Sequence, residues 1–213
     1  MKWRKSSTMK IIKESIKSEI VEKKSKFIAN IYFVHNNEEA ENIIKETKKK
    51  YHDARHNCSC YRVLEQGNII EKYSDDGEPA GTAGAPMLNI LQKKELVNVA
   101  VIVTRYFGGI LLGTGGLVRA YSEVTQKAIE EANAIEIVMG KEYEVKVDYS
   151  NIEKLKYYAK TNNINITKIE YLNEIVCNLQ IPNEAIDKFI NDIKEQKINI
   201  IEYKEICEKY IIK

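Results

Sequence analysis

Nine of the ten glycines in this chain of 213 residues lie between Gly67 and Gly116, and this clustering constrains the fold more than any other feature. Glycine adopts positive φ at no steric cost and lets other groups approach the backbone closely. The segment is therefore expected to contain tight turns, close backbone contacts or a ligand-binding loop. Because the flanking segments show only ordinary periodic patterns, the functional hypotheses centre on this region.

Hydrophobic periodicity predicts the elements around the glycines. They are two strands within 17–34 joined near Lys23–Lys24, a helix capped by Asn36 or Asn37 and closed by Lys48–Lys50, and a hairpin of 56–64 and 68–73 that turns at Gln66–Gly67. A short helix over 86–93, a strand over 97–104 and a helix over about 116–134 follow. The strand over 97–104 is apolar on both faces, so we expect it to be central and covered on both sides. Glycine and proline make residues 74–86 irregular.

A second unit is predicted from residue 139 onward. The segment 142–149 alternates cleanly between apolar and charged residues, and Ser150 and Glu153 have the spacing of a capping box. Further elements are expected as strands over 164–171 and 174–181, a helix after Pro182, and a strand over about 198–206. This β-α-β-β-α-β order is the ferredoxin-like pattern. The chain is thus expected to be an α+β protein with a mobile N-terminal tail (1–16) and domains over 17–138 and 139–213.

Composition excludes several classes of protein. The chain is 44% hydrophobic and 30% charged, which is typical of a folded domain rather than a disordered one. The longest strongly apolar stretch, from Leu96 to Thr104, is far shorter than the ~20 residues of a spanning helix. The basic start has no apolar segment after it, so no signal peptide is expected. We therefore expect a cytoplasmic protein with no membrane contact and four reduced cysteines.

Charge is unevenly distributed along the chain. Residues 1–50 hold 13 Lys or Arg against 7 Asp or Glu, a net charge of +6. The same count gives 8 against 11, or −3, over 51–140, and 12 against 13, or −1, over 141–213. The basic end can attract nucleic acid without sequence or DNA specificity. The alternative is an ordinary solvated, lysine-rich surface.

The segment that joins the apolar strand to the long helix is the first candidate site. Backbone N–H groups and the positive end of a helix converge there, which suits an anion, and arginine adds forked donors for phosphate. The candidate phosphate- or nucleic-acid-binding residues are Arg105, Tyr106, Gly108, Gly109, Gly113, Thr114, Gly115, Gly116, Arg119 and Tyr121. The alternative is that the glycines only permit tight turns and close packing. The spacing matches neither a Rossmann fingerprint nor a Walker A loop.

The acidic loop over 74–79 is the second candidate site. Asp75, Asp76 and Glu78 can hold Mg²⁺ together with phosphate oxygens, or two of them can act as acid and base. Thr82 follows closely and can orient a ligand. The alternative is a surface turn, which is the commoner use of Asp and Gly.

The third candidate lies on the strand that begins near His56. In this pattern Cys58 can act as a nucleophile with His56 as its base, or His56, Cys58 and Cys60 can bind metal. Zinc sites usually place two to four residues between paired cysteines, so the spacing is poor. Because neighbours on one strand face are often simply packed, no metal site and no catalytic residue are assigned.

Three blocks of sequence carry a family resemblance: ARHNCSCYR over 54–62, SDDGEPAGTAGAP over 74–86 and VTRYFGGILLGTGGLVRAY over 103–121. In this order and spacing they resemble the YigZ/IMPACT family. The resemblance implies an N-terminal domain like the second domain of a small-subunit ribosomal protein, and a C-terminal domain like the last domain of elongation factor EF-G. It also implies a link to translation, because eukaryotic members bind the activator of a stress kinase that acts on an initiation factor.

The resemblance and the residues together favour one function and leave two alternatives. The favoured hypothesis is a non-enzymatic, translation-associated regulator that binds a ribosome, structured RNA or a translation-linked protein. The first alternative is an enzyme for a phosphorylated or nucleotide ligand, with the glycine segment cradling phosphate and the acidic loop holding Mg²⁺. The second is a protein–protein adaptor that uses the exposed face of the ferredoxin-like sheet. No cofactor other than Mg²⁺ is expected.

Overall fold

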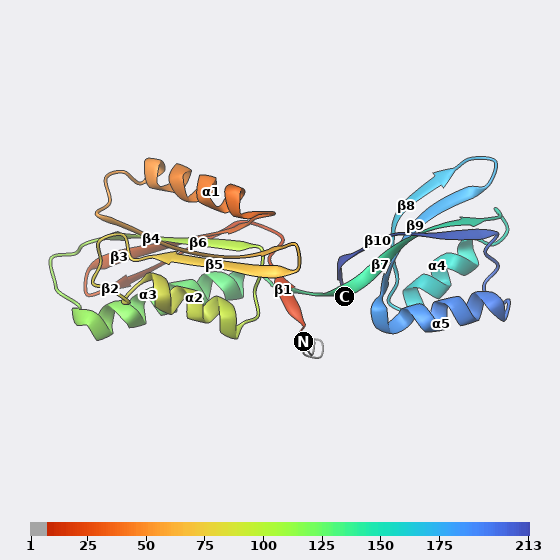
Figure 1. Ribbon diagram of the computed structural model, residues 1–213. Coiled ribbons are helices and arrows are strands. Elements are labelled where there is room, and N and C mark those ends of the chain that lie inside the picture. Colours follow the sequence, from red (N-terminus) through yellow and green to blue (C-terminus); the bar gives the residue numbers. More distant parts are fainter. Residues whose placement is uncertain (1–7) are drawn as a thin grey trace. The chain divides into compact units, whose positions relative to one another are not determined.

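The computed structural model describes residues 8–213, which divide into two compact α+β units (Figure 1). The first unit ends at Ile135 and the second comprises Glu136–Lys213. The division therefore lies three residues before the predicted boundary. The reason is that one long strand, β7 (Ile135–Val147), begins where the first unit ends, so no separate linker lies between them.

Nine elements build the first unit. They are β1 (Met9–Ile11), β2 (Ile16–Glu22), β3 (Ser25–Phe33), α1 (Asn37–Lys50), β4 (His56–Glu65), β5 (Asn68–Ser74), α2 (Gly84–Lys93), β6 (Val99–Tyr106) and α3 (Gly113–Glu131). The antiparallel sheet has the order β2-β3-β6-β4-β5, so β6 is central, as its sequence predicts. Helix α1 covers one face of the sheet, and α2 and α3 cover the other (Figure 1).

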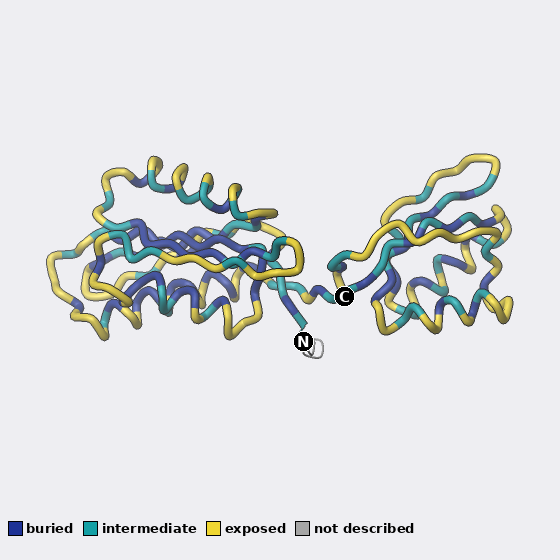
Figure 2. Tube along the Cα trace, viewed as in Figure 1, coloured by how far each residue is buried: buried dark blue, intermediate teal, exposed yellow. Residues whose placement is uncertain are grey.

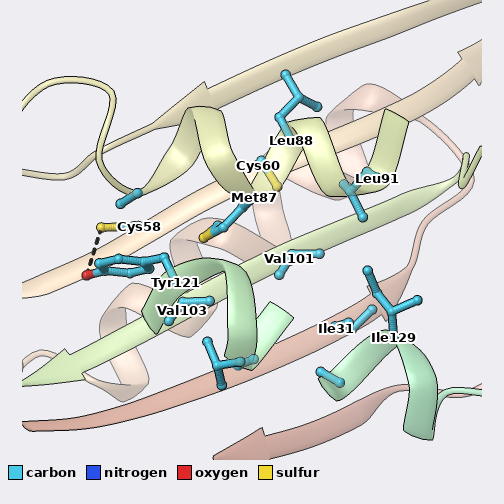
Figure 3. Packing of buried hydrophobic residues seen from close by; sticks show 14 of the residues in the cluster. Ile31, Cys58, Cys60, Met87, Leu88, Leu91, Val101, Val103, Tyr121 and Ile129 are labelled. Carbon is cyan, nitrogen blue, oxygen red and sulfur yellow. Dashed lines mark hydrogen bonds between the residues drawn. The ribbon is translucent and has the colours of Figure 1, made fainter. Parts of the chain in front are cut away.

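Alternation along β6 supplies both layers of the core. Val101 and Val103 face α2 and α3, whereas Ala100 packs in the smaller cluster under α1. Figure 3 shows Cys58 of β4 and Met87 of α2 in the larger cluster, together with the two valines. Figure 2 shows the central strands as almost continuously buried. A strand buried on both faces is apolar along most of its length, as residues 99–103 of β6 are, and this run is recognisable in the sequence.

Local turn and cap signals are confirmed. Lys23 and Lys24 adopt positive φ between β2 and β3, as Gln66 and Gly67 do between β4 and β5. Such left-handed pairs match the twist of a two-residue hairpin. Asn36 caps α1, because its side chain accepts a hydrogen bond from the N–H of Glu39 at 2.8 Å.

The N-terminal segment differs from the predicted tail over 1–16. Residues 1–7 lie outside the described part of the chain, but Ile12 is fully buried in the first unit's core. Strand β1 is held by two backbone bonds, from the N–H of Lys10 to Glu95 and from the N–H of Val97 to Lys10, both at 2.9 Å. The sequence missed this because the partner strand segment lies about 85 residues further along the chain.

The second unit has the predicted ferredoxin-like order. After β7 come α4 (Ile152–Thr161), β8 (Asn165–Tyr171), β9 (Ile175–Pro182), α5 (Asn183–Lys194) and β10 (Glu202–Ile212). The strands lie in the order β10-β7-β9-β8, and both helices cover one face (Figure 1). Cys177 of β9 is fully buried there, as its place on the apolar face predicts.

Two local predictions in this unit are wrong. The residue before α4 is Asn151 and no side chain caps that helix, so Ser150 and Glu153 do not form a capping box. The last strand begins at Glu202 rather than near 198. Ile198 is instead buried in the core after a turn, in which the N–H of Lys197 donates to Asp192 at 2.9 Å.

Candidate functional site

The glycine-rich region meets the sheet at one end, where β6 finishes and β4 begins. His56 pairs with Arg105 in this antiparallel register, and α3 begins there as well. These parts enclose a cleft of about 450 Å³. Its walls are Arg55 and His56, residues 77–79 of the acidic loop, Arg105 and Phe107, and Leu111–Thr114 with Leu117.

The last glycines of the predicted loop are in fact the first turn of a helix. Helix α3 begins at Gly113, which has φ +73°, a conformation that other residues adopt only with strain. Leu112 precedes the helix, and no side chain caps its first turn. The first N–H groups of a helix have no intrahelical partner. The uncapped positive end of α3 therefore borders the cleft at Gly113 and Thr114.

Arg105 forms the buried wall of this cleft. Its Nη1 donates to Oε1 of Glu78 at 2.7 Å, and its guanidinium lies 5.5 Å from the ring centre of Phe27 and 5.6 Å from that of Phe107. Arg105 is only 6% exposed, and its Nε–H is buried without a hydrogen-bond partner among residues 8–213. An unpartnered buried donor costs free energy, so a ligand atom that accepts from it would be stabilised.

Glu78 also joins Arg105 to a buried polar chain. The Tyr121 hydroxyl donates to Oε1 of Glu78 at 3.0 Å, and the Cys58 thiol is 3.3 Å from that hydroxyl and 2.9 Å from the carbonyl oxygen of Asp75. Figure 3 shows the contact between Cys58 and Tyr121. Burial, and then the charges of Glu78 and Asp76, raise the pKa of the Cys58 thiol to about 12. Because the thiolate is the nucleophile, Cys58 is poorly suited to nucleophilic catalysis near neutral pH.

The acidic loop uses its carboxylates to hold its own shape. Asp75 accepts from the backbone N–H groups of residues 81, 83 and 84 at 2.8–3.0 Å. Asp76 pairs with Lys48 at 2.6 Å and accepts from the N–H of Asn57 at 2.7 Å. Thr82 donates to the carbonyl of Pro79 at 2.6 Å. These bonds place the acidic loop beside the cleft but direct its carboxylates into the protein.

Metal ligands are sparse around this loop. Within residues 8–213 no group of three or more His, Cys, Asp and Glu side chains is arranged to hold a metal ion. His56 directs Nδ1 to the carbonyl of Asp76 at 2.9 Å, so Nδ1 carries the proton in that bond. A magnesium ion would need ligand oxygens from a phosphate in addition to these side chains.

The other candidate residues are dispersed. Gly108 has a packing role, because a Cβ there would lie 2.0 Å from the carbonyl carbon of Lys24. The Tyr106 hydroxyl donates to Asp53 at 2.9 Å. Arg119 is exposed on α3 among Ser122 and Lys127, away from the cleft. The structure thus brings His56, Glu78, Arg105, Gly113 and Thr114 into one cleft and leaves Arg119 outside it.

Sequence reasoning missed the apolar rim and one cation of the cleft. Arg55 is exposed beside His56. Phe107 and Leu111 are 47% and 82% exposed, although both are large and apolar. The apolar run Ile110–Leu112 between two glycine pairs could have indicated this rim, because a loop that only faces solvent does not need three large apolar residues.

The fold and the cleft define a two-unit α+β protein with a ligand-sized, partly apolar site in its first unit. Residues 23–129 match the Impact N-terminal domain, and residues 145–196 match the domain of unknown function DUF1949. The chain belongs to the IMPACT family. No helix within residues 8–213 is long and apolar enough to cross a membrane.

Similar proteins cover nearly the whole chain. The IMPACT family member YvyE of Bacillus subtilis is 33% identical over 90% of this chain and 92% of its own. The IMPACT family member YigZ of Escherichia coli is 30% identical over 78% of this chain and 82% of its own. A crystal structure of a hypothetical protein matches with a TM-score of 0.59 at 26% identity, over 96% of this chain and all of that one.

Proposed function

We propose that this protein is a non-enzymatic, translation-associated binding protein whose cleft captures an anionic group of its partner. One observation carries the proposal: the buried Arg105, with its Nε–H unpartnered, lies in the wall of the cleft that borders the uncapped start of α3. A bound anion would accept hydrogen bonds from the free N–H groups of Arg105 and of the first turn of α3. It would also interact favourably with the positive end of the helix.

The chemistry of the cleft favours binding over catalysis. The Cys58 thiol is protonated near neutral pH, and Glu78 forms an ion pair with Arg105. Asp75 and Asp76 are occupied by backbone N–H groups and by Lys48. A general acid or base must be free to exchange a proton with its substrate, and these carboxylates are engaged in hydrogen bonds and ion pairs within the protein. The proposed partner belongs to the translation machinery, because the chain resembles a family whose eukaryotic members regulate translation.

An enzyme that binds a phosphorylated small molecule is the second candidate. The observation in its favour is that the acidic loop and the start of α3 line the same cleft, whose volume is within the range of ligand pockets. A thermal-shift screen with nucleotides and Mg²⁺ tests it. A ligand-dependent rise in the melting temperature that disappears in Thr114→Glu would favour this function.

Ribosome co-sedimentation over a salt series tests the proposed function, with free structured RNA as competitor. Thr114 is exposed at the rim of the cleft, so Thr114→Glu adds a carboxylate there, and Thr114→Gln is the matched neutral control. We expect wild type, Thr114→Gln and Arg119→Ala to sediment with ribosomes at low salt. Thr114→Glu should remain in the supernatant. Absence of wild-type binding, or equal binding by Thr114→Glu, would overturn the proposal.

A further inference from the structure

We infer that the anionic group recognised by the cleft is the free C-terminal carboxylate of a partner protein whose last side chain is apolar. This inference rests on the proposed function, because it names the ligand of the same anion site. The observation behind it is that hydrogen-bond donors for an anion and apolar side chains lie next to each other in the lining of the cleft.

The donors line one cleft rather than an extended track. They are the first N–H groups of α3 at Gly113 and Thr114, the unpartnered Nε–H of Arg105, and the exposed guanidinium of Arg55 at the rim. A carboxylate accepts hydrogen bonds through both of its oxygens. Capture of a terminal carboxylate by converging backbone N–H groups is a known mode of peptide recognition.

The apolar wall begins at the same residues. Leu112 is the residue directly before the helix, Leu117 lies about one turn into it, and both line the cleft with Phe107. A ligand must therefore present its charge and its apolar group within a few ångströms of each other. A C-terminal residue does so, because both groups hang on one Cα. In an extended segment, neighbouring acidic and apolar side chains point to opposite sides.

The surrounding charge argues against a polyanion. Residues 51–140, which supply the cleft, have a net charge of −3, and Asp75 and Asp76 lie in the adjoining loop. RNA binding needs several cations along the backbone, and its affinity comes mainly from those contacts. A single carboxylate needs only one site. The exposed Leu111, 82% exposed at the rim, can cover the end of a short peptide.

Fluorescence anisotropy with short peptides tests the inference. The probes are N-terminally fluorescein-labelled decapeptides with one common body, ending in Leu, Phe, Lys or Glu, each as the free acid and as the amide. We expect the Leu and Phe acids to bind most tightly, and amidation to weaken them by about tenfold or more, because the charge-assisted hydrogen bonds are lost. Thr114→Glu should weaken the free acids much more than the neutral Thr114→Gln does, whereas Arg119→Ala, which lies outside the cleft, should leave their affinity unchanged.

A uridine decanucleotide serves as the rival probe. Three results would overturn the inference: equal affinity of acid and amide, no binding of any peptide at millimolar concentration, or binding of the oligonucleotide with the same dependence on Thr114. The proposed function fails separately, because it is tested by ribosome co-sedimentation. If the wild type sediments with ribosomes, Thr114→Glu does not, and no peptide binds, the C-terminal carboxylate is refuted as the ligand. The proposed anion site would then still stand.

Discussion

Nη1 of Arg105 donates to Oε1 of Glu78 over 2.7 Å, and both residues are more than nine-tenths buried. The pair joins β6 to the acidic loop, so it fixes two walls of the cleft relative to each other. Breaking a buried pair leaves an uncompensated charge, which costs more than the intact pair contributes. Arg105 is therefore a structural residue as well as a candidate ligand-binding one.

Arg105→Ala is expected to lower the free energy of unfolding by about 3–5 kcal/mol, because it leaves the Glu78 carboxylate buried and unpaired. Chemical denaturation of Arg105→Ala, Glu78→Gln and the double variant measures the coupling between the two residues. The double variant should be less destabilised than the sum of the singles. Strict additivity would show that the two side chains do not interact.

Cys58 is expected to influence stability at alkaline pH. Its pKa is raised to about 12 in the folded protein, from an ordinary value of 9.0. Above pH 9 the unfolded chain loses this proton while the folded chain keeps it, so stability falls as pH rises towards 12. One such group contributes a slope of ~1.4 kcal/mol per pH unit.

Cys58→Ser removes that group and should flatten the dependence of unfolding free energy on pH between 9 and 12. Urea denaturation at several pH values measures it. Cys207→Ser is the control, because Cys207 is exposed. An identical slope in wild type and Cys58→Ser would contradict the buried, protonated thiol.

Gly108→Ala is expected to destabilise the protein by about 1–3 kcal/mol, the usual cost of overpacking. An added Cβ would lie 2.0 Å from the backbone of Lys24, so the turn between β2 and β3 would have to move. Gly115→Ala is the matched control, because its Cβ would meet nothing within 4 Å. We expect Gly115→Ala to be neutral or stabilising by up to about 1 kcal/mol, since alanine favours helix. Thermal unfolding distinguishes the two.

Asp75→Ala is expected to loosen the acidic loop, because three backbone N–H groups lose their shared acceptor. Hydrogen bonds to a charged group contribute ~1.5–3 kcal/mol each, and the three share one carboxylate, so a loss of about 2–4 kcal/mol is expected. Hydrogen exchange at Gly81, Ala83 and Gly84 should accelerate.

A magnesium titration of the same variant separates structure from metal binding. If Asp75 only holds the loop, Mg²⁺ and EDTA should leave the melting temperature of wild type unchanged. A Mg²⁺-dependent rise in wild type that is absent from Asp75→Ala would instead show a metal role for this loop.

Local signals in the sequence were sufficient for most elements of the fold. The turn at Lys23–Lys24, the cap at Asn36 and the apolar β6 each depend on a few neighbouring residues, so each was predictable. The capping box before α4 and the start of β10 were not. For β10, packing decided the outcome, because Ile198 is buried in the core of the second unit rather than paired in the strand.

The sequence by itself determined the two α+β units, the central strand and the glycine-rich segment that borders the cleft, because these follow from apolar periodicity and glycine spacing. Only the tertiary structure decided which residues share the cleft. Arg105 and Arg119 look equivalent in sequence, but one is buried against Glu78 and the other is exposed elsewhere on α3. The physical reason is that the burial and ion pairing of a side chain depend on residues from β4, β6, the acidic loop and α3. These residues are distant in sequence, so no local pattern predicts that they lie together.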